Sequence, residues 1–475
     1  MTSRSFVFAT TGWLLLLGTG CGASSELLQT SLDEVVDSGH VTPHLDSGIP
    51  DVRVGIPDTG RVDVSVPAEA SVIDTGIDTS LPGDAGPYPA TFPDPPQVVN
   101  ALGPVLTSPK IVAILFNNDD ATEVPQIESF MMGIGTSKYW NVVSEYGVGP
   151  ATAQIVSLNE AAPATIDDTA RQGQNSDLQN WLLGEITAGT VPEPDANTEY
   201  MIVYPATTTI TEDGTTLCGQ SGVGGYHTDI QNGQTLIAYG VLPRCAGMGG
   251  LTDMQIFTGS SSHEIVEAAT DPYPDFNPAW SQCDNAHIFW DEADFGSEVG
   301  DMCEVQPEAF YQFPDFPFVV QRIWSNQAAR MGTDPCQPEY AGETYFAAVP
   351  VLPDLVSFPQ IGNSIMVSTK KIAVGASGTV ELDLYSEGPT QPWTVTVQDF
   401  NYLTTGNASS ALLSFSMPQT TGQNGTKLPV TITVNTAGNM NTNGQIDNSE
   451  LFLVEATQGT GNNQVVNLWW GMVSN

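Results

Sequence analysis

The stretch from residue 22 to about residue 95 most strongly limits what this 475-residue chain can fold into. It is rich in Pro, Val and Asp, and Asp-x-Gly triplets recur at irregular spacings, starting at Asp37, Asp46, Asp58, Asp74 and Asp84. A segment of this composition can bury too little apolar area to offset the conformational entropy that is lost on folding. Its negatively charged side chains also repel one another. We therefore expect residues 22–95 to form a disordered acidic linker, with every hydrophobic core outside it.

The first 21 residues predict export across a membrane. Arg4 precedes an apolar run from Phe6 to Leu17, and small residues follow, which is the pattern of a secretion signal. Residues 17–21 are similar to a bacterial lipobox and predict a lipidated Cys21. The alternative is an ordinary signal peptide cleaved near Ala23. Because no later segment has about 18 consecutive apolar residues, an acyl anchor is the expected membrane attachment.

The charge of the chain excludes some partners. Twelve Lys and Arg face 54 Asp and Glu, a formal net charge of −42. Such a chain is repelled by nucleic-acid phosphates, whereas its carboxylates suit hard cations. We expect an extracytoplasmic lipoprotein of the outer membrane or cell surface. Its expected partners are the membrane, through the anchor, and an extracellular protein, peptide or polysaccharide.

Two different patterns follow the linker. Between residues 96 and 342, short apolar runs such as Lys110–Phe116 and Tyr200–Tyr204 alternate with amphipathic stretches such as Asn175–Ile186, which predicts an α/β domain. Between residues 343 and 475, short alternating segments are separated by Gly, Asn and Pro turns, which predicts an immunoglobulin-like β-sandwich. The expected fold class is multidomain α+β. The segments with this alternation include Ile372–Val374, Thr379–Tyr385, Trp393–Val397, Val430–Val434 and Glu450–Ala456.

One helical motif carries the strongest chemical signal. His263, Glu264 and Glu267 form a His-Glu-x-x-Glu pattern on a predicted helix that Pro272 ends. Residues at positions i and i+4 share a helix face, so His263 and Glu267 can bind the same metal ion. Glu264 then projects beside that ion, where a general base is needed. The spacing is that of the zinc-protease His-Glu-x-x-His helix, with a carboxylate in place of the second histidine.

A catalytic zinc site takes three protein ligands and one water, so a third ligand is needed. Asp301 is the first choice and Glu298 the second, since both lie close to Cys303, whose disulfide would fix the backbone. The alternative for both is a turn in which the carboxylates cap backbone amides. His227, at the end of a glycine-rich loop, is a further candidate ligand or a hydrogen-bonded structural histidine. Zinc is the expected cofactor, although one imidazole with two carboxylates also resembles the ligands of non-haem iron.

The cysteines after residue 21 are expected to pair in an oxidising compartment. Proximity in the sequence favours Cys218 with Cys245 and Cys283 with Cys303, which leaves Cys336 without a partner. The spacing matches no zinc–thiolate site.

A possible calcium loop lies near the C-terminus. Residues 439–450 have the twelve-position spacing of such a loop, with Gly444 at position six and Glu450 at position twelve. The first three ligand positions are Asn instead of Asp, so an Asn- and Gly-rich hairpin is the competing interpretation. Calcium is therefore a second candidate cofactor.

Several motifs occur together in one order between about residues 105 and 340. They are the Trp140–Tyr146 helix, the Cys218–His227 loop, the Ser262–Pro272 stretch, Trp280, and Glu298-Val299-Gly300-Asp301-Met302-Cys303. This combination resembles bacterial secreted relatives of the plant phosphate-induced (EXORDIUM-like) family. The resemblance implies an extracellular, cell-surface-associated protein with a zincin-like motif.

Two functions of different classes follow from these patterns. The first is a surface-tethered zinc peptidase or related metal-dependent hydrolase, with a metal held by His263, Glu267 and Asp301 and with Glu264 as general base. The second is a non-catalytic binding or adhesion lipoprotein with a structural or vestigial metal site, whose sandwich binds carbohydrate or a partner. Substitution of Glu264 by Gln separates them, because only the hydrolase loses an activity while the metal stays bound.

Overall fold

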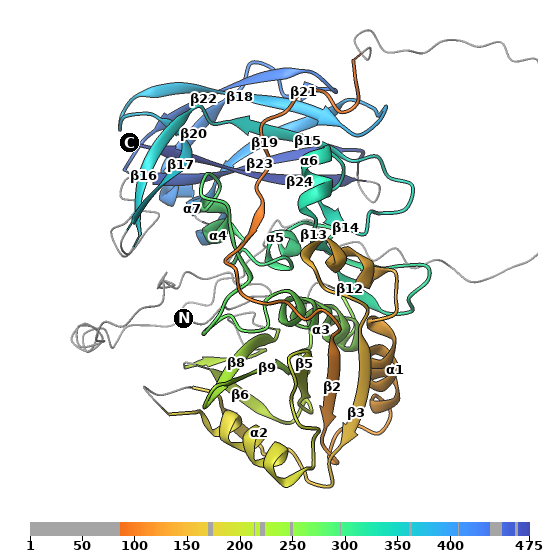
Figure 1. The fold of residues 1–475 in the computed structure, drawn as a ribbon. Coiled ribbons are helices and arrows are strands. Elements are labelled where there is room, and N and C mark those ends of the chain that lie inside the picture. Colours follow the sequence, from red (N-terminus) through yellow and green to blue (C-terminus); the bar gives the residue numbers. More distant parts are fainter. Residues whose placement is uncertain are drawn as a thin grey trace, which may run out of the picture.

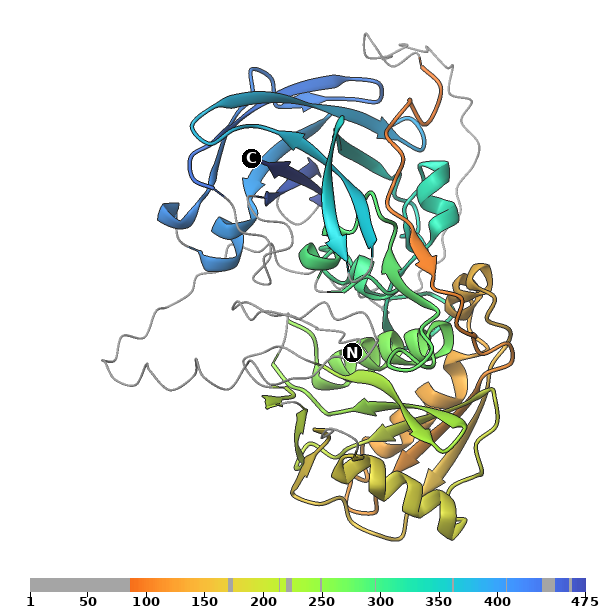
Figure 2. The ribbon, with the colours of Figure 1, turned by 60° about the vertical axis from the view of Figure 1, so that its left-hand side comes forward.

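The structure is a computed structural model that describes residues 86–475, apart from 170–173, 213, 219–223, 248–249, 295, 361–362, 407, 438–448 and 461–463. It is a mixed α/β protein in which strands predominate (Figures 1 and 2). The predicted lipidation site and nearly all of the predicted linker lie outside the described residues, as does the candidate calcium loop except for Ser449 and Glu450. None of the described helices is long and apolar enough to cross a bilayer.

A five-stranded sheet follows the first ordered segment. Its strand order is β3-β2-β5-β9-β8; the first four strands are parallel, and the edge strand β8 runs antiparallel to β9. The strands are β2 (Lys110–Leu115), β3 (Thr152–Ser157), β5 (Thr198–Val203), β8 (Tyr226–Asn232) and β9 (Thr235–Leu242).

Helices cover both faces of this sheet. Strand β2 explains why: Ile111, Ala113 and Leu115 belong to the core cluster on one face, whereas Val112 and Ile114 belong to the cluster on the other. A strand buried on both faces is continuously apolar, as the sequence predicted. On the first face lie α1 (Val124–Ile134), the 3₁₀ helix η1 (Tyr139–Tyr146) and α3 (Asp253–Thr270); α2 (Asp177–Ala188) covers the second.

Helix α3 carries the His-Glu-x-x-Glu motif and is buried on all sides. It begins at Thr252, where a capping box with Gln255 satisfies backbone amides, and it ends at Asp271 before Pro272. Every residue from Ile256 to Thr270 is buried, because the helix packs between the sheet and the strands that follow it in the sequence. Gly259 allows this close packing, since a Cβ there would lie 2.6 Å from Cδ1 of Phe310.

Short elements connect α3 to the C-terminal strands. Three two-stranded antiparallel ribbons are β1 (Val98–Asn100) with β10 (Trp280–Cys283), β11 (Phe310–Gln312) with β12 (Val319–Gln321), and β13 (Ile323–Trp324) with β14 (Cys336–Gln337). The short helices here are α4 (Phe289–Ala293), α5 (Asp301–Glu304) and α6 (Asn326–Met331). A separate sheet joins β4 (Thr165–Asp167), β6 (Thr209–Glu212) and β7 (Thr215–Thr216) beside the five-stranded sheet.

The strands between residues 346 and 474 form two further sheets (Figure 1). Buried side chains of both sheets belong to one hydrophobic cluster. The first sheet, in spatial order, is β15 (Phe346–Val351), β18 (Ser377–Ser386), β22 (Lys427–Val434) and β20 (Leu413–Ser416). The second is β16 (Asp354–Gln360), β17 (Asn363–Lys371), β24 (Val465–Ser474), β23 (Ser449–Gln458), β19 (Trp393–Asp399) and β21 (Thr421–Gly422). The helix α7 (Phe400–Thr405) and the 3₁₀ helix η2 (Ala408–Ser410) follow β19.

One strand prediction in this region is wrong. The predicted strand Ile372–Val374 lies outside β17, which ends at Lys371. After one hydrogen bond from Ile372 N to the Ser474 carbonyl, at 2.9 Å, the chain turns at Gly375, whose φ is +78°.

Packing begins before the predicted end of the linker. Ala90 N donates a hydrogen bond to Oδ1 of Asn424 at 3.0 Å, and the Phe92 ring stacks on Tyr385 with centroids 4.2 Å apart. The segment from Gly86 therefore lies along the C-terminal sheets, where Figure 1 shows it in orange, before it reaches β1. The apolar residues that make this contact are few, so composition alone does not reveal them.

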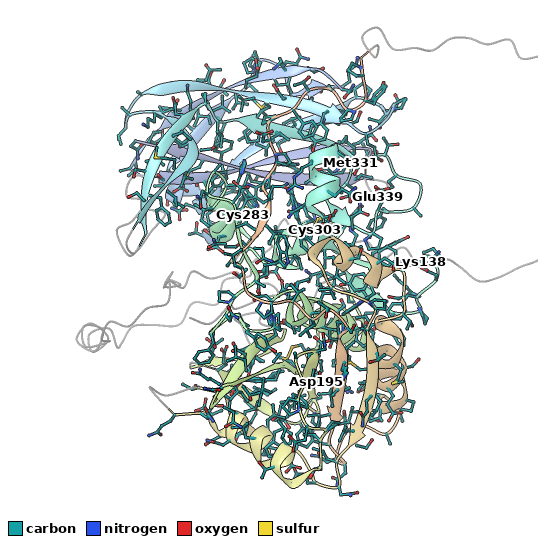
Figure 3. All side chains as sticks on the ribbon, in the orientation of Figure 1. Lys138, Asp195, Cys283, Cys303, Met331 and Glu339 are labelled. Carbon is teal, nitrogen blue, oxygen red and sulfur yellow. A yellow bond between two sulfur atoms is a disulfide. The ribbon has the colours of Figure 1, made fainter. Side chains whose placement is uncertain are left out.

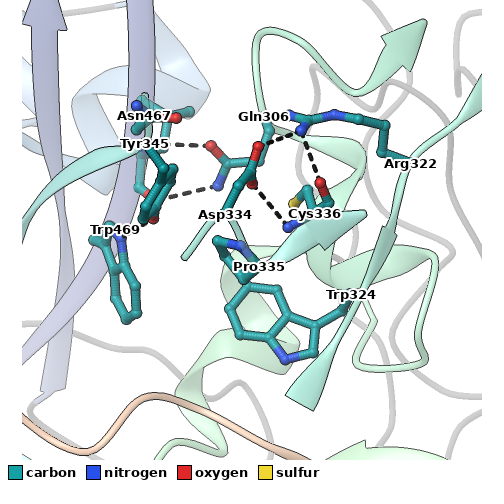
Figure 4. A pocket seen from close by; sticks show the side chains of 10 residues that line it. Gln306, Arg322, Trp324, Asp334, Pro335, Cys336, Tyr345, Asn467 and Trp469 are labelled. Atoms are coloured by element: carbon teal, nitrogen blue, oxygen red, sulfur yellow. Dashed lines mark hydrogen bonds and ion pairs between the residues drawn. The ribbon is translucent and has the colours of Figure 1, made fainter. Parts of the chain in front are cut away.

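Strand β24 is tied to the segment that carries Asp301. The Gln306 side chain exchanges two hydrogen bonds with the Leu468 backbone, both of 3.1 Å, and Trp470 Nε1 donates to Oδ1 of Asp294 at 2.7 Å. Figure 4 shows the small cavity beside Gln306, where Arg322 pairs with Asp334. No residue of the motif lines that cavity.

One of the two predicted disulfides is confirmed, and the other is wrong. Cys218 pairs with Cys245, as expected, but Cys303 pairs with Cys336, so the predicted Cys283–Cys303 bond is wrong. Cys283 is buried and free, held in β10 by pairing with Val98. Cys336 instead comes beside α5 because β14 pairs with β13 (Figure 3 labels Cys283 and Cys303).

Candidate metal centre

Helix α3 and the start of α5 bring three predicted ligands together. Nε2 of His263 lies 2.9 Å from Oε2 of Glu267 and 3.4 Å from Oδ1 of Asp301. One ligand atom from each side chain lies within 4.8 Å of the others, a spacing compatible with one metal ion. We call His263, Glu267 and Asp301 the first triad.

These atoms do not satisfy one another by hydrogen bonding. Neither ring nitrogen of His263 has a hydrogen-bond partner, so the 2.9 Å approach to Glu267 lacks the alignment of an N–H···O bond. Oδ1 of Asp301 has no hydrogen-bond partner either. Both side chains are at most 2% exposed, and a buried polar group without a partner is costly. A cation between them would give the His263 nitrogen and the Asp301 oxygen a partner, so the residues fit a metal.

The turn before α5 is held against α3 by backbone donors. The N–H groups of Gly300 and Asp301 donate to Oε1 of Glu267 at 2.9 and 3.2 Å, and Glu298 N donates to Oδ2 of Asp301 at 3.0 Å. The capping role weighed for Asp301 thus applies to one oxygen and leaves the other facing His263. Glycine is needed at position 300, because a Cβ there would lie 2.7 Å from Nδ1 of His263 and 2.8 Å from Oε1 of Glu267.

The edge strand β8 adds His227 from the other side. Its Nδ1 lies 3.7 Å from Oε2 of Glu267, and its Nε2 lies 3.7 Å from Oε1 of Glu298. One ligand atom from each of His227, Glu267 and Glu298 again lies within 4.8 Å of the others. We call these residues the second triad. Neither ring nitrogen of His227 meets the geometry of a hydrogen bond to a protein group, although Glu264 and Glu267 lie 3.6 and 3.7 Å from Nδ1.

Glu264 stands beside His227 of the second triad. Its Oε2 lies 3.6 Å from Nδ1 of His227, the same nitrogen that approaches Glu267. Neither carboxylate oxygen has a hydrogen-bond partner, and burial raises the pKa of this carboxyl group. Gly225 closes over it, since a Cβ there would lie 3.0 Å from Cγ of Glu264. A buried carboxyl with a raised pKa is suited to take up and release a proton.

The electrostatics of the cluster favour cations. Burial lowers the pKa of His263, but Glu267, Asp301 and Glu264 together outweigh it and hold that pKa well above its ordinary value. Burial likewise lowers the pKa of His227, and Glu264 and Glu267 raise it above its ordinary value. Burial raises the pKa of Asp301 to about 6, Glu267 adds to this, and His263 opposes it.

The structure brings together every residue that the sequence nominated for this site. Asp301 lies with His263 and Glu267, and the second and third choices, Glu298 and His227, lie beside them with Glu267 in common. The sequence did not indicate that His227 and Glu298 form a group of their own, nor that Gly300 and Gly225 are needed for close approach. The glycine-rich stretch that ends in His227 was the available signal.

Family models, curated proteins and solved structures were compared with the chain, and none of them matches it.

Proposed function

We propose that this protein is a surface-tethered, metal-dependent hydrolase, and that a zinc peptidase is the most suitable class. One observation carries the proposal: the buried carboxylate of Glu264, which has no hydrogen-bond partner, stands beside a triad of metal-ligand type. A structural metal site has no need of such a carboxylate, whereas hydrolysis requires a group that moves a proton.

The roles of the residues follow from their positions. His263, Glu267 and Asp301 would hold the ion, and the backbone amides of Gly300 and Asp301 orient Glu267. A zinc ion bound there supplies Lewis acidity, which activates water and polarises a carbonyl group. Glu264 accepts a proton from the attacking water and passes it to the leaving amine. Its raised pKa favours the second of these steps.

The proposal also covers the fold around the site and the attachment of the protein to a membrane. We propose that the α/β part is zincin-like and related to the EXORDIUM-like family, and that the C-terminal sheets form an immunoglobulin-like sandwich. The helix motif and the two-layer arrangement of residues 346–474 support this. The signal and Cys21 support a lipid anchor at the outer membrane or cell surface, which would present the site to extracellular protein, peptide or polysaccharide.

A non-catalytic protein with a structural metal is the second candidate. The specific observation in its favour is that Oε1 of Glu267 accepts two backbone hydrogen bonds and thereby clamps α3 to the start of α5. In that case the ion only strengthens a clamp that joins two parts of the fold.

Replacement of Glu264 by Gln distinguishes the two candidates. The variant keeps shape and volume but cannot accept a proton, so we expect bound zinc to be retained and cleavage of an unfolded protein substrate to fall by about 10²- to 10⁴-fold. Glu199→Gln is the matched control. Glu199 is also a buried glutamate without hydrogen-bond partners, but burial alone raises its pKa, with no charged neighbour contributing. Absence of hydrolysis in the wild type, with zinc bound, would favour the structural role.

A further inference from the structure

We propose that the centre holds two divalent metal ions bridged by Glu267, with the second ion bound by His227 and Glu298. This inference rests on the proposed metal centre and extends it from one ion to two. Glu267 belongs to both triads, and the two groups are separate in every other residue.

One ion cannot collect all of these side chains as they stand. Ligands at about 2.0–2.2 Å from one zinc ion lie no more than about 4.4 Å from one another. Ligand atoms lie within 4.8 Å of one another in each triad, but the five side chains do not form one such group. Two ions would share Glu267, whose Oε2 is the oxygen that both histidines approach.

The second triad has features of a site beyond a cluster of acidic residues. The imidazole of His227 is 1% exposed, and both of its nitrogens lack a hydrogen-bond partner. Nδ1 lies 3.7 Å from Oε2 of Glu267 and Nε2 lies 3.7 Å from Oε1 of Glu298, and one ring nitrogen lies within 4.8 Å of ligand atoms of both carboxylates. Asp271, where α3 ends, lies beside Glu298, and its Oδ1 accepts a hydrogen bond from Ala279 N at 2.6 Å.

The charge of the buried centre also favours two ions. Glu264, Glu267, Glu298 and Asp301 are all buried, and so is Asp271 beside Glu298. One divalent cation compensates only two negative charges of such a cluster, whereas two divalent cations compensate four. Uncompensated buried charge is strongly unfavourable, so binding of a first ion leaves a site that attracts a second. Paired ions about 3.5–4 Å apart are a known arrangement in hydrolytic enzymes, including aminopeptidases.

Metal stoichiometry tests the inference directly. The full-length protein is stripped with a chelator, loaded with zinc, desalted and measured by mass spectrometry of the metal. We expect two zinc ions per chain in the wild type, one in Glu298→Gln and in His227→Gln, and two in the control Glu199→Gln, whose carboxylate lies outside both triads. One zinc in both the wild type and Glu298→Gln would overturn the second site and leave the hydrolase proposal standing. No zinc in the wild type would overturn both.

A measurement on the wild type alone covers the case in which the variants do not fold. Manganese loaded into the stripped protein should give the electron paramagnetic resonance spectrum of a magnetically coupled pair, because Glu267 bridges the ions. The spectrum of isolated manganese at saturating metal would overturn the inference.

Discussion

Substitution of Gly300 by Ala tests whether the turn before α5 approaches α3 as closely as described. Gly300 has φ −78° and ψ −47°, which any residue adopts, so an alanine introduces no backbone strain. Its Cβ would lie 2.7 Å from Nδ1 of His263, 2.9 Å from Cε1 of the same ring and 2.8 Å from Oε1 of Glu267. The substitution therefore acts through steric overlap of the new Cβ with the side chains of His263 and Glu267, two candidate metal ligands.

The magnitude follows from two opposing contributions. Overpacking a buried site costs about 1–3 kcal/mol, whereas replacing glycine by alanine restricts the unfolded chain and stabilises by about 0.4–1 kcal/mol. We expect the free energy of unfolding to fall by about 1–2 kcal/mol. Because the ring and the carboxylate must move apart, zinc affinity should also fall, by about tenfold for each 1.4 kcal/mol of lost binding free energy.

Gly184→Ala is the control for this prediction. Gly184 lies within α2, is exposed, and a Cβ there would contact nothing within 4 Å. Its substitution should stabilise the helix by about 0.5–1 kcal/mol and leave zinc affinity unchanged. Urea unfolding of the metal-free full-length protein and competition with a chromophoric zinc chelator measure both quantities. If Gly300→Ala behaves like Gly184→Ala in both assays, the described contact between the turn and α3 does not exist.

Two further predictions concern the disulfides and a buried carboxyl group. Peptide mapping without reduction should recover Cys303 linked to Cys336 and a free thiol at Cys283; a Cys283–Cys303 peptide would refute this pairing. Cys336→Ser should lower stability by about 3–4 kcal/mol in urea unfolding, since the bond closes a loop with a sequence separation of 33 residues. Burial raises the pKa of Asp168 to about 6, so the folded state binds a proton more tightly than the unfolded chain. Stability should therefore fall, by up to about 3 kcal/mol, as pH rises from about 4 to 6. Asp168→Asn should remove that part of the pH dependence, and an unchanged slope would contradict it.

Local features of the site could be predicted from the sequence because they depend on short-range rules. Pro272 directly follows the end of α3, as the sequence predicted, and the helical period places His263 and Glu267 on one face. Asp301 could be nominated because carboxylates near a constrained cysteine are plausible ligands. In the structure its Oδ1 lies 3.4 Å from Nε2 of His263. The apolar run of β2 likewise indicated a strand buried on both faces.

The remaining features depend on contacts between distant segments. His227 reaches Glu267 only because β8 pairs antiparallel with β9, with His227 opposite Gly240, and no local pattern specifies that register. The Cys303–Cys336 bond depends on the pairing of β13 with β14, whereas proximity in the sequence favoured Cys283. The need for glycine at position 300 is visible only once the turn lies against α3.

Zinc content of the purified full-length protein, wild type beside His263→Ala, tests the metal centre most directly. Removal of the imidazole takes a ligand from the first triad but leaves the second triad intact. We predict that the wild type binds zinc and that His263→Ala loses one equivalent of it. A wild type that binds no zinc, or a variant that binds as much as the wild type, would contradict the assignment of His263, Glu267 and Asp301 as metal ligands.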